Sequence, residues 1–202
     1  MLAAMTNDRL HCQIAFVLEL DKLKAVVRQT LLTDGSRRET DGEHSWHIAT
    51  MAHVLAEYAP PATDIGRVTA MLLVHDVVEI DAGDTFIHDE VGARDKEARE
   101  RAAADRLFGL LPDDQRDQFR ALWEEFEAKA TPEAIFADAL DRMQPILNNF
   151  ATQGGSWRQH AVTADKVLRL VARIDRGAPA LGAYTRELVA EAVRRGYLAG
   201  AV

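Results

Sequence analysis

The sequence predicts an all-α fold, a bundle of about eight helices. Apolar residues recur at helical spacing through most of the 202 residues, and no alternating apolar and polar run is long enough to predict a strand. Short groups rich in Gly, Pro, Asp and Ser interrupt this periodicity and predict where helices end. The expected helices cover residues 8–30, 44–58, 64–80, 93–110, 113–130, 132–150, 157–175 and 180–196.

The boundaries of these helices follow from residues that do not continue a helix. Proline lacks a backbone N–H and glycine loses the most conformational freedom on folding, so both residues mark turns. The interruptions, in chain order, are Asp34-Gly35-Ser36, Pro60-Pro61, Ala82-Gly83, Pro112, Pro132, Gly154-Gly155 and Gly177-Ala178-Pro179. None is long enough to link two domains, and no internal repeat is present, so residues 1–202 are expected to form a single domain.

Composition and charge exclude several classes of protein. The 24 basic and 32 acidic residues give a net charge of -8, and the basic residues are scattered, so a nucleic-acid polymer is not expected as a partner. Cys12 is the one cysteine, which indicates a reducing, cytoplasmic setting. Asp8 and Arg9 precede any apolar segment, and no apolar stretch approaches membrane-spanning length, so neither a secretory signal nor a membrane span is expected.

The stretch LLVHDVVEIDAGD, residues 72–84, places two ionisable side chains inside an apolar helix face. Desolvating a carboxylate costs several kcal/mol unless it is paired or bound to a cation, so Asp76 needs a partner. An isolated pair of this kind is explained most simply if His75 and Asp76 satisfy each other or a nearby backbone group. A shared metal ion is the alternative, provided that other helices supply further ligands.

Two residues elsewhere in the chain are candidates to complete such a metal site. His44 opens the second expected helix, and Asp141 lies within the apolar stripe of the sixth. Imidazole and carboxylate groups are the ligands expected for Mn, Co, Fe or Zn, and four of them leave positions open for water and a substrate oxygen. Pro145 removes the N–H that would bond to the Asp141 carbonyl, and it should kink the helix beside this ligand.

The ordered set of His44, His75-Asp76 and Asp141 on three helices resembles the signature of the HD-domain metal-dependent phosphohydrolases. The segments VVRQTLLTDGSRRETDGEHSWHIATMAHVLAEYA, LLVHDVVEIDAGD and LWEEFEAKATPEAIFADALDRMQPIL are similar to the branch that includes bacterial 5'-deoxynucleotidases and their eukaryotic HD-domain-containing relatives. This similarity extends from about residue 14 to about residue 160. It implies the HD-domain helical bundle, in agreement with the helical periodicity.

The resemblance implies that one divalent metal ion is held by four residues, His44, His75, Asp76 and Asp141. Some HD enzymes bind two metals through extra histidines between the His-Asp dyad and the final aspartate. That interval contains only His88 in this sequence, so a single metal ion is expected. His47 and His53 are interpreted as packed or surface histidines rather than ligands.

Three further residues match the family's catalytic groups. Glu79 and Asp84 match the acidic pair that assists the deoxynucleotidase reaction, and Arg28 matches a phosphate-contacting arginine. Glu79 lies four residues after His75, so both should project from one helix face, and the alternative is a solvent-facing carboxylate at a helix end. Asp84 follows a probable helix stop and could simply cap a turn. Arg28 could equally be a surface arginine at a helix C-terminus.

The resemblance implies hydrolysis of a nucleoside or deoxynucleoside 5'-monophosphate to inorganic phosphate and a nucleoside. Glu79 would orient or deprotonate the attacking water, Arg28 would hold the non-bridging phosphate oxygens, and Asp84 would position or protonate the leaving group. In the well-defined deoxynucleotidases this arginine is followed by tryptophan, which helps to exclude the ribose 2'-hydroxyl. Here Arg28 is followed by Gln29, so selectivity for deoxyribose is not expected to follow from this position.

Two other classes of function remain open at this point. One is a different HD activity on triphosphates or cyclic phosphodiesters, and the other is a non-catalytic helical module that binds a metal or a nucleotide. The resemblance also implies a homodimer. Apolar residues on the late helices could form that contact, although core packing explains them as well: Trp157, Leu168, Leu170 and Val171.

Overall fold

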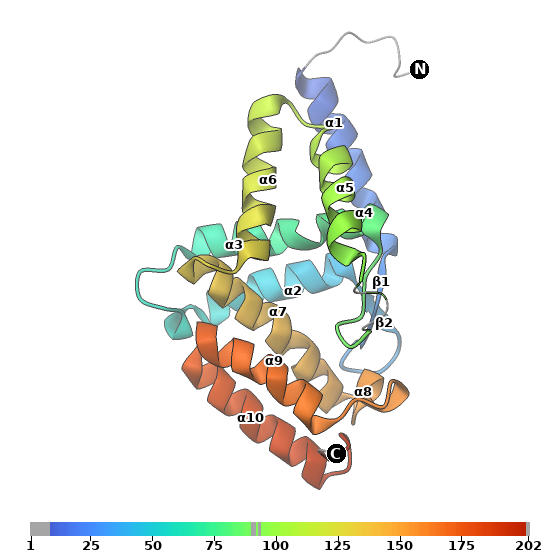
Figure 1. Ribbon diagram of the computed structural model, residues 1–202, viewed down its shortest axis with the longest axis vertical. Helices are drawn as coiled ribbons and strands as arrows, with labels where there is room; N and C mark the ends of the chain where they lie inside the picture. Colours follow the sequence, from blue (N-terminus) through green and yellow to red (C-terminus); the bar gives the residue numbers. More distant parts are fainter. Residues whose placement is uncertain (1–8, 90–91, 93, 201–202) are drawn as a thin grey trace.

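The computed structural model describes residues 9–89, 92 and 94–200, and it is built almost entirely of α-helices (Figure 1). The helices are α1 (Arg9–Leu20), α2 (Asp41–Val54), α3 (Ile65–Val74), α4 (Glu79–Ala82), α5 (Lys96–Phe108), α6 (Asp113–Ala128), α7 (Pro132–Ala151), α8 (Gly155–Gln159), α9 (Ala164–Gly177) and α10 (Pro179–Arg194). The predicted all-α class is confirmed. No helix in these described ranges has the length and apolar content needed to cross a membrane.

The expectation that residues 8–30 form one helix is wrong in its second half. After α1 the chain makes a 3-10 turn over Asp21–Ala25 and then forms β1 (Val27–Leu31), which pairs antiparallel with β2 (Arg38–Thr40). The strand segment is rich in valine, threonine and leucine, and β-branched side chains favour the extended backbone. The predicted break at Asp34-Gly35-Ser36 is therefore the turn of a hairpin, in which Gly35 has a φ of 72°.

Two other expected helices are divided in the structure. The helix expected at 64–80 changes to a 3-10 turn at His75–Val78 and resumes as α4, and the helix expected at 157–175 becomes α8 and α9. Ala161, between α8 and α9, has a φ of 49°, which a continuous helix does not allow. The 3-10 turn contains the His-Asp dyad, and short 3-10 segments within helical stretches often mark functional positions.

Helix α7 occupies the centre of the fold. It packs against α2, α3 and α6 on one side and against α9 and α10 on the other, and Figure 1 shows it lying between these groups. Thr131 caps its first turn, accepting a hydrogen bond from the backbone N–H of Ala134, and Pro132 occupies the first helical position. The helix continues through Pro145 to Ala151, so this proline lies within α7 and does not end it.

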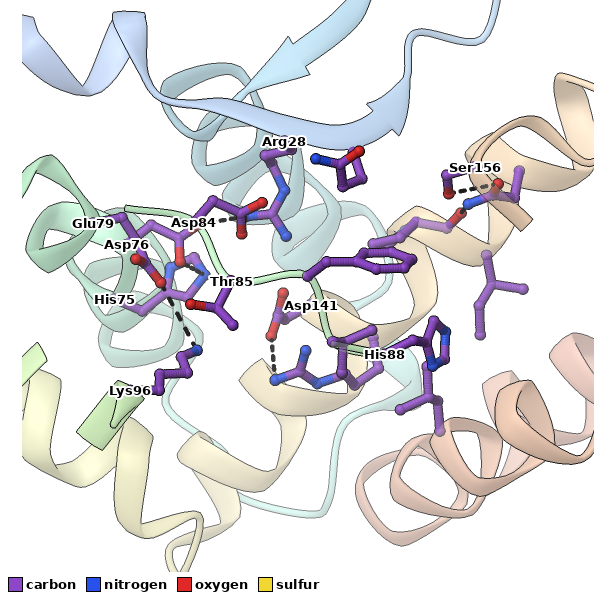
Figure 2. A pocket seen from close by; sticks show the side chains of 18 of the residues that line it. Arg28, His75, Asp76, Glu79, Asp84, Thr85, His88, Lys96, Asp141 and Ser156 are labelled. Atoms are coloured by element: carbon purple, nitrogen blue, oxygen red, sulfur yellow. Dashed lines mark hydrogen bonds and ion pairs between the residues drawn. The ribbon is translucent and has the colours of Figure 1, made fainter. Parts of the chain in front are cut away.

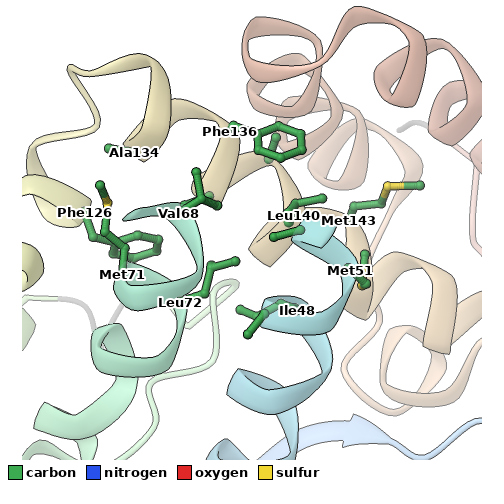
Figure 3. Packing of buried hydrophobic residues seen from close by; sticks show 14 of the residues in the cluster. Ile48, Met51, Val68, Met71, Leu72, Phe126, Ala134, Phe136, Leu140 and Met143 are labelled. Carbon is green, nitrogen blue, oxygen red and sulfur yellow. The ribbon is translucent and has the colours of Figure 1, made fainter. Parts of the chain in front are cut away.

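The hydrophobic core lies where α2, α3, α6 and α7 meet, and Figure 3 shows its packing. Large side chains from these helices are almost fully buried there, including Ile48, Met51, Met71, Leu72, Phe126, Phe136 and Leu140. Trp157 and Val171 also belong to the core, at 4% and 0% exposed, so they do not offer a dimer contact. Leu168 is exposed, and the homodimer stays a prediction.

The start of α2 is defined by a capping box. The Thr40 hydroxyl accepts from the backbone N–H of Glu43, and the Glu43 carboxylate accepts from the backbone N–H of Thr40. The helix therefore begins at Asp41. The sequence had predicted a start three residues later, at His44. This cap places His44 in the first turn and directly after the hairpin.

Helices α7 and α9 approach each other closely at Gly177. A Cβ atom at this position would lie 2.5 Å from the Ile135 carbonyl oxygen and 2.9 Å from the Ala139 Cβ. Both contacts are shorter than packed atoms tolerate, and one is to rigid backbone. The absence of a side chain at Gly177 therefore allows α9 to pack against the helix that carries Asp141.

We expect Gly177→Ala to lower the free energy of unfolding by about 1–3 kcal/mol, because the added methyl group overpacks this contact. Gly42→Ala is the matched control, since a Cβ there meets nothing closer than 3.9 Å and alanine favours the helix. Denaturant unfolding of both variants measures the difference. An equal effect of the two substitutions would contradict the close-approach explanation.

Candidate metal centre and active-site pocket

Three buried side chains from separate segments meet at one point. His44 comes from α2, His75 begins the 3-10 turn after α3, and Asp141 lies in α7. One nitrogen or oxygen atom of each lies within 4.8 Å of the corresponding atoms of the other two, and all three residues are buried. Within the described part of the chain this is the only group of such residues placed to hold a metal.

His75 presents an electron pair that no described residue uses. Its Nδ1 lies 2.9 Å from the Leu72 carbonyl oxygen, which only accepts hydrogen bonds, so Nδ1 carries the proton. Burial lowers the pKa of His75 and favours the neutral ring, whose Nε2 then has a lone pair. No hydrogen bond to a described residue satisfies this Nε2, although Asp76 Oδ1 lies 3.1 Å away. Two electron-rich atoms at this separation favour a cation beside them.

His44 is oriented by a buried relay of side chains. The amide nitrogen of Gln144 donates to Glu39 Oε2 over 2.9 Å, so its amide oxygen faces His44 Nδ1, 3.0 Å away. His44 Nε2 lies 3.1 Å from Asp141 Oδ1. Burial and Arg28 oppose a charge on His44, but its hydrogen bond to Asp141 and the carboxylate of Glu39, 3.6 Å from its Nδ1, outweigh them and raise its pKa to about 9. A proton and a metal ion therefore compete for His44 Nε2.

Asp76, the fourth predicted ligand, lies at the edge of this group. Its Oδ1 lies 3.1 Å from His75 Nε2, and its Oδ2 accepts a hydrogen bond from Arg28 over 3.0 Å. Burial favours the protonated acid, but the electrostatic contacts with His75 and Arg28 outweigh it and lower the pKa of Asp76. Asp76 thus connects the three-residue group to the arginine on β1.

The donor set fits a divalent transition metal. Neighbouring ligands around a six-coordinate ion with bonds of about 2.1 Å lie about 3 Å apart. The His44–Asp141 and His75–Asp76 pairs each have a nitrogen-to-oxygen separation of 3.1 Å. Imidazole nitrogens and carboxylate oxygens are ligands that Mn, Co, Fe and Zn all accept. Together with the unpartnered Nε2 of His75, these distances fit the metal that the resemblance implies.

Asp141 is also contacted by a cation from its own helix. Arg142 Nη2 lies 3.2 Å from Asp141 Oδ2. Burial alone would raise the pKa of Asp141, but Arg142 and the hydrogen bond from His44 outweigh it and hold this pKa well below its usual range. Asp141 therefore stays ionised, as a metal ligand must.

Arg28 lies in the site, and its expected position at a helix C-terminus is wrong because this segment is strand β1. Its Nη1 donates to Asp41 Oδ1 over 2.8 Å and to Asp76 Oδ2 over 3.0 Å, and it lies 3.8 Å from Asp84 Oδ1. Burial opposes the charge on the guanidinium, but Asp76, Asp84 and Asp41 outweigh it and raise the pKa of Arg28. The arginine is therefore a charged member of the site, and a solvated surface position is ruled out.

Glu79 is buried at 4% exposed, which excludes a solvent-facing carboxylate at a helix end. Its Oε1 lies 3.8 Å from Lys96 Nζ, and its Oε2 forms no hydrogen bond with a described residue. Burial and the charge of Asp76 raise the pKa of Glu79 to about 9. A divalent cation nearby would lower this pKa, because opposite charge favours the ionised form.

Asp84 is placed in the site by the glycine before it. Gly83 ends α4 with a φ of 75°, and the chain then turns so that Asp84 and Arg28 point toward each other (Figure 2). Burial raises the pKa of Asp84, partly offset by Arg28. The structure therefore gives Asp84 a partner in the pocket in place of a simple turn-capping role.

These groups line one end of a pocket, and Figure 2 shows His88 and Ser156 at the opposite end from His75. Six acidic side chains and three lysine or arginine side chains line the pocket in the described part of the chain. The acidic residues are Asp76, Glu79, Asp84, Glu100, Glu127 and Asp141, and the basic ones are Arg28, Lys96 and Arg142. This excess of negative charge favours an added cation.

Several members of the site were not predicted from the sequence. Asp41 is fully buried and binds Arg28, and burial together with the charge of Asp76 raises its pKa to about 8. The density of acidic residues just before His44 was the available signal for Asp41. Gln144 and Lys96 carried no such signal, because their partners are distant in sequence or depend on how the helices pack.

The other histidines stay outside the ligand group, in agreement with the sequence interpretation. His47 is half-buried, with its Nδ1 3.3 Å from the Gln144 amide nitrogen, and His53 is exposed and lies 3.0 Å from the Thr69 hydroxyl. His88 lines the pocket, where burial and Lys166 lower its pKa to about 4. No histidine other than His44 and His75 therefore belongs to the candidate ligand group in the described part of the chain.

Known proteins resemble this chain in sequence and in structure. The chain is 65% identical to the protein in a crystal structure described as a predicted metal-dependent phosphohydrolase from Magnetospirillum magnetotacticum, which covers 95% of this chain and 98% of that one with a TM-score of 0.90. It is 31% identical over 135 residues to the 5'-deoxynucleotidase HDDC2 of Homo sapiens and 29% identical over 139 residues to a 5'-deoxynucleotidase of Klebsiella pneumoniae.

The extent of these similarities differs. The human match covers 66% of this chain and 65% of the relative, so the chain spans just under two thirds of the length of that protein. The Klebsiella match covers 63% of this chain and 69% of the relative. A model of the HD domain matches residues 20–182, which include every candidate ligand and catalytic residue described above. The chain therefore belongs to the HD domain family.

Proposed function

We propose that this protein is a metal-dependent phosphohydrolase that releases inorganic phosphate from nucleoside or deoxynucleoside 5'-monophosphates. The observation that carries the proposal is the buried group of His44, His75 and Asp141, whose ligand atoms lie within 4.8 Å of one another beside a charged pocket. Membership of the HD domain family supports the phosphohydrolase class. The names of the 5'-deoxynucleotidase relatives support the nucleotide substrate.

We assign the metal to four ligands, His44, His75, Asp76 and Asp141. A single divalent Mn, Co, Fe or Zn ion held there would supply Lewis-acid chemistry, polarising the phosphate and making water easier to deprotonate. Leu72 and Gln144 would support the two histidines by fixing a proton on each Nδ1, which leaves each Nε2 for the metal.

Glu79 orients and deprotonates the attacking water in this proposal. It begins α4, directly after the 3-10 turn and three residues after Asp76, and both carboxylates line the pocket. Glu79 is not one of the assigned ligands. Its buried Oε2 has no hydrogen-bond partner among the described residues and is available to a water. Lys96, 3.8 Å from the other oxygen, stabilises the ionised form.

Arg28 and Asp84 act on the phosphate and the leaving group. The hydrogen bonds of Arg28 to described residues use Nη1, which leaves Nη2 for a non-bridging phosphate oxygen. The pKa of Asp84 is raised by burial, so this carboxyl can hold a proton for the departing 5'-oxygen of the nucleoside. The two groups lie 3.8 Å apart, close enough to act on one ester.

A panel of substrates tests the proposal against the other classes of function. Phosphate release from nucleoside monophosphates, triphosphates and cyclic phosphodiesters, each with Mn, Co and Mg, should be highest for the monophosphates. Preference for a triphosphate or a phosphodiester would replace this proposal by another HD activity. Lack of turnover with every substrate and metal would indicate a binding module.

We expect the purified protein to hold about one metal ion per chain and His75→Ala to lose it, because the remaining donors no longer surround the ion. His53→Ala is the control, since His53 is exposed and lies outside the ligand group. Elemental analysis and phosphate release are measured on the same samples. Undiminished metal content in His75→Ala would remove this residue from the site.

Glu79→Gln separates a catalyst from a ligand, because it preserves the size of the side chain while removing its basic oxygen. Turnover should fall by about 10²–10⁴, the usual contribution of general-base assistance, while metal content stays unchanged. Asp81→Asn is the control on the same short helix, since Asp81 pairs with Arg106 away from the pocket. Loss of metal would make Glu79 a ligand, and full activity would exclude it from the mechanism.

Gln29 bears on sugar selectivity. It lines the pocket next to Arg28, and its amide oxygen lies 3.0 Å from His160 Nε2. Without an aromatic gate at position 29, AMP and dAMP should be hydrolysed with kcat/KM values within about tenfold, since excluding one hydroxyl depends on local steric contacts. Gln29→Trp should shift this ratio toward dAMP. A strong preference of the wild type for dAMP would mean that another residue excludes the hydroxyl.

A further inference from the structure

The pocket has a second end whose side chains the proposed chemistry does not use. Apolar side chains from the loop after Asp84 and from α7, α8 and α9 also line the pocket: Phe86, Ile87, Pro145, Ile146, Trp157 and Leu170. Figure 2 shows His88 and Ser156, the chain neighbours of Ile87 and Trp157, at the end away from His75. The charged end is the one that contains Arg28 and the candidate metal ligands. A pocket with a charged end and an apolar end fits a ligand that combines an anionic group with a flat apolar one.

Phe86 is the aromatic residue best placed to contact such a ligand. It lies two residues after Asp84, so the two Cα atoms are at most about 7 Å apart. Its ring packs against His160 with centroids 4.6 Å apart and against His88 with centroids 5.1 Å apart. His160 Nε2 is in turn 3.0 Å from the amide oxygen of Gln29 on β1. The ring is therefore held in place by His160 from another segment and by His88 from its own loop.

The amide groups at this end are already engaged within the protein. Asn149 donates from Nδ2 to the Pro145 carbonyl oxygen over 2.8 Å, and its Oδ1 accepts from the Ser156 hydroxyl and the Trp157 backbone N–H. The amide oxygen of Gln29 is occupied by His160. Neither amide in this described lining offers a complete donor and acceptor edge to a ligand, so contacts to ring faces are what this end provides.

We propose that Phe86 is the stacking surface for the nucleobase of the substrate, with His160 and Gln29 as positioning residues that hold its ring over the pocket. The inference rests on the proposed nucleotide substrate and adds the subsite that recognises it. Because every base has an aromatic face, stacking on Phe86 without edge contacts tolerates both purines and pyrimidines. Affinity for the base then depends on Phe86, whereas the phosphate is bound at the charged end of the pocket.

The metal-loaded wild type and Phe86→Ala are compared on a nucleoside 5'-monophosphate and on ribose 5-phosphate, which lacks a base. Losing one base–aromatic stack should raise KM for the nucleotide about tenfold and leave KM and kcat for ribose 5-phosphate unchanged. Phe86→Tyr should restore the wild-type KM. His160→Ala should raise KM for the nucleotide in the same direction while kcat stays unchanged, as expected of a positioning residue.

Tyr184→Ala is the matched control, because Tyr184 is an exposed aromatic residue on α10 that does not line the pocket. It should leave KM for the nucleotide unchanged. Equal losses for nucleotide and ribose 5-phosphate in Phe86→Ala, or a tenfold loss in Tyr184→Ala, would overturn the stacking role and indicate a general effect on the protein.

Calorimetry separates this inference from the proposed function. Deoxyadenosine carries the base without a phosphate, so its binding to the metal-loaded protein should weaken about tenfold in Phe86→Ala, while binding of inorganic phosphate stays unchanged. If nucleotides are not hydrolysed but this binding difference is found, the proposed function fails and the subsite stands. If nucleotides are hydrolysed and Phe86→Ala binds deoxyadenosine as the wild type does, the subsite fails and the function stands.

Discussion

The rest of the structure depends on one constraint. Several carboxylates are buried close together, and their negative charge must be compensated. An unpaired buried carboxylate costs several kcal/mol, so each acidic group must meet a guanidinium, an imidazole or a metal ion. These partners come from β1, α2, the 3-10 turn and α7, and they meet only if the four segments keep one relative position. Core residues adjacent to the ligands provide this: Ile48 lies one turn after His44, and Leu72 lies one turn before His75.

The two histidines each have a partner at Nδ1, but they obtain it by different routes. His75 uses a local contact, since its Nδ1 bonds to a carbonyl oxygen three residues earlier. His44 depends on Gln144, 100 residues away, which is itself oriented by Glu39 on β2. The small hairpin therefore does more than connect α1 to α2. One of its strands carries Arg28 and the other carries the carboxylate that begins the relay to His44.

Sequence reasoning reached the helical class and the central site residues because their signals are local. Helical periodicity is visible in short windows, and a histidine and an aspartate inside an apolar face stand out at once. The hairpin was missed because a five-residue strand beside a helix has too few residues to show a period. Gln144 and the Phe86–His160 contact were missed for a different reason. Their importance comes from neighbours 74 to 105 residues away in the chain, which only the folded structure identifies.

The two ends of the pocket are built on different kinds of backbone, and this affects how such a protein can diverge. The candidate metal ligands lie on helices and a 3-10 turn packed into the core, where a substitution disturbs several buried partners at once. Phe86 and Gln29 lie on a loop and on the strand of a two-stranded hairpin, and such connecting segments tolerate change more readily than core helices do. Gene duplicates of this fold can therefore acquire new substrates through these two segments while the hydrolytic centre is inherited intact.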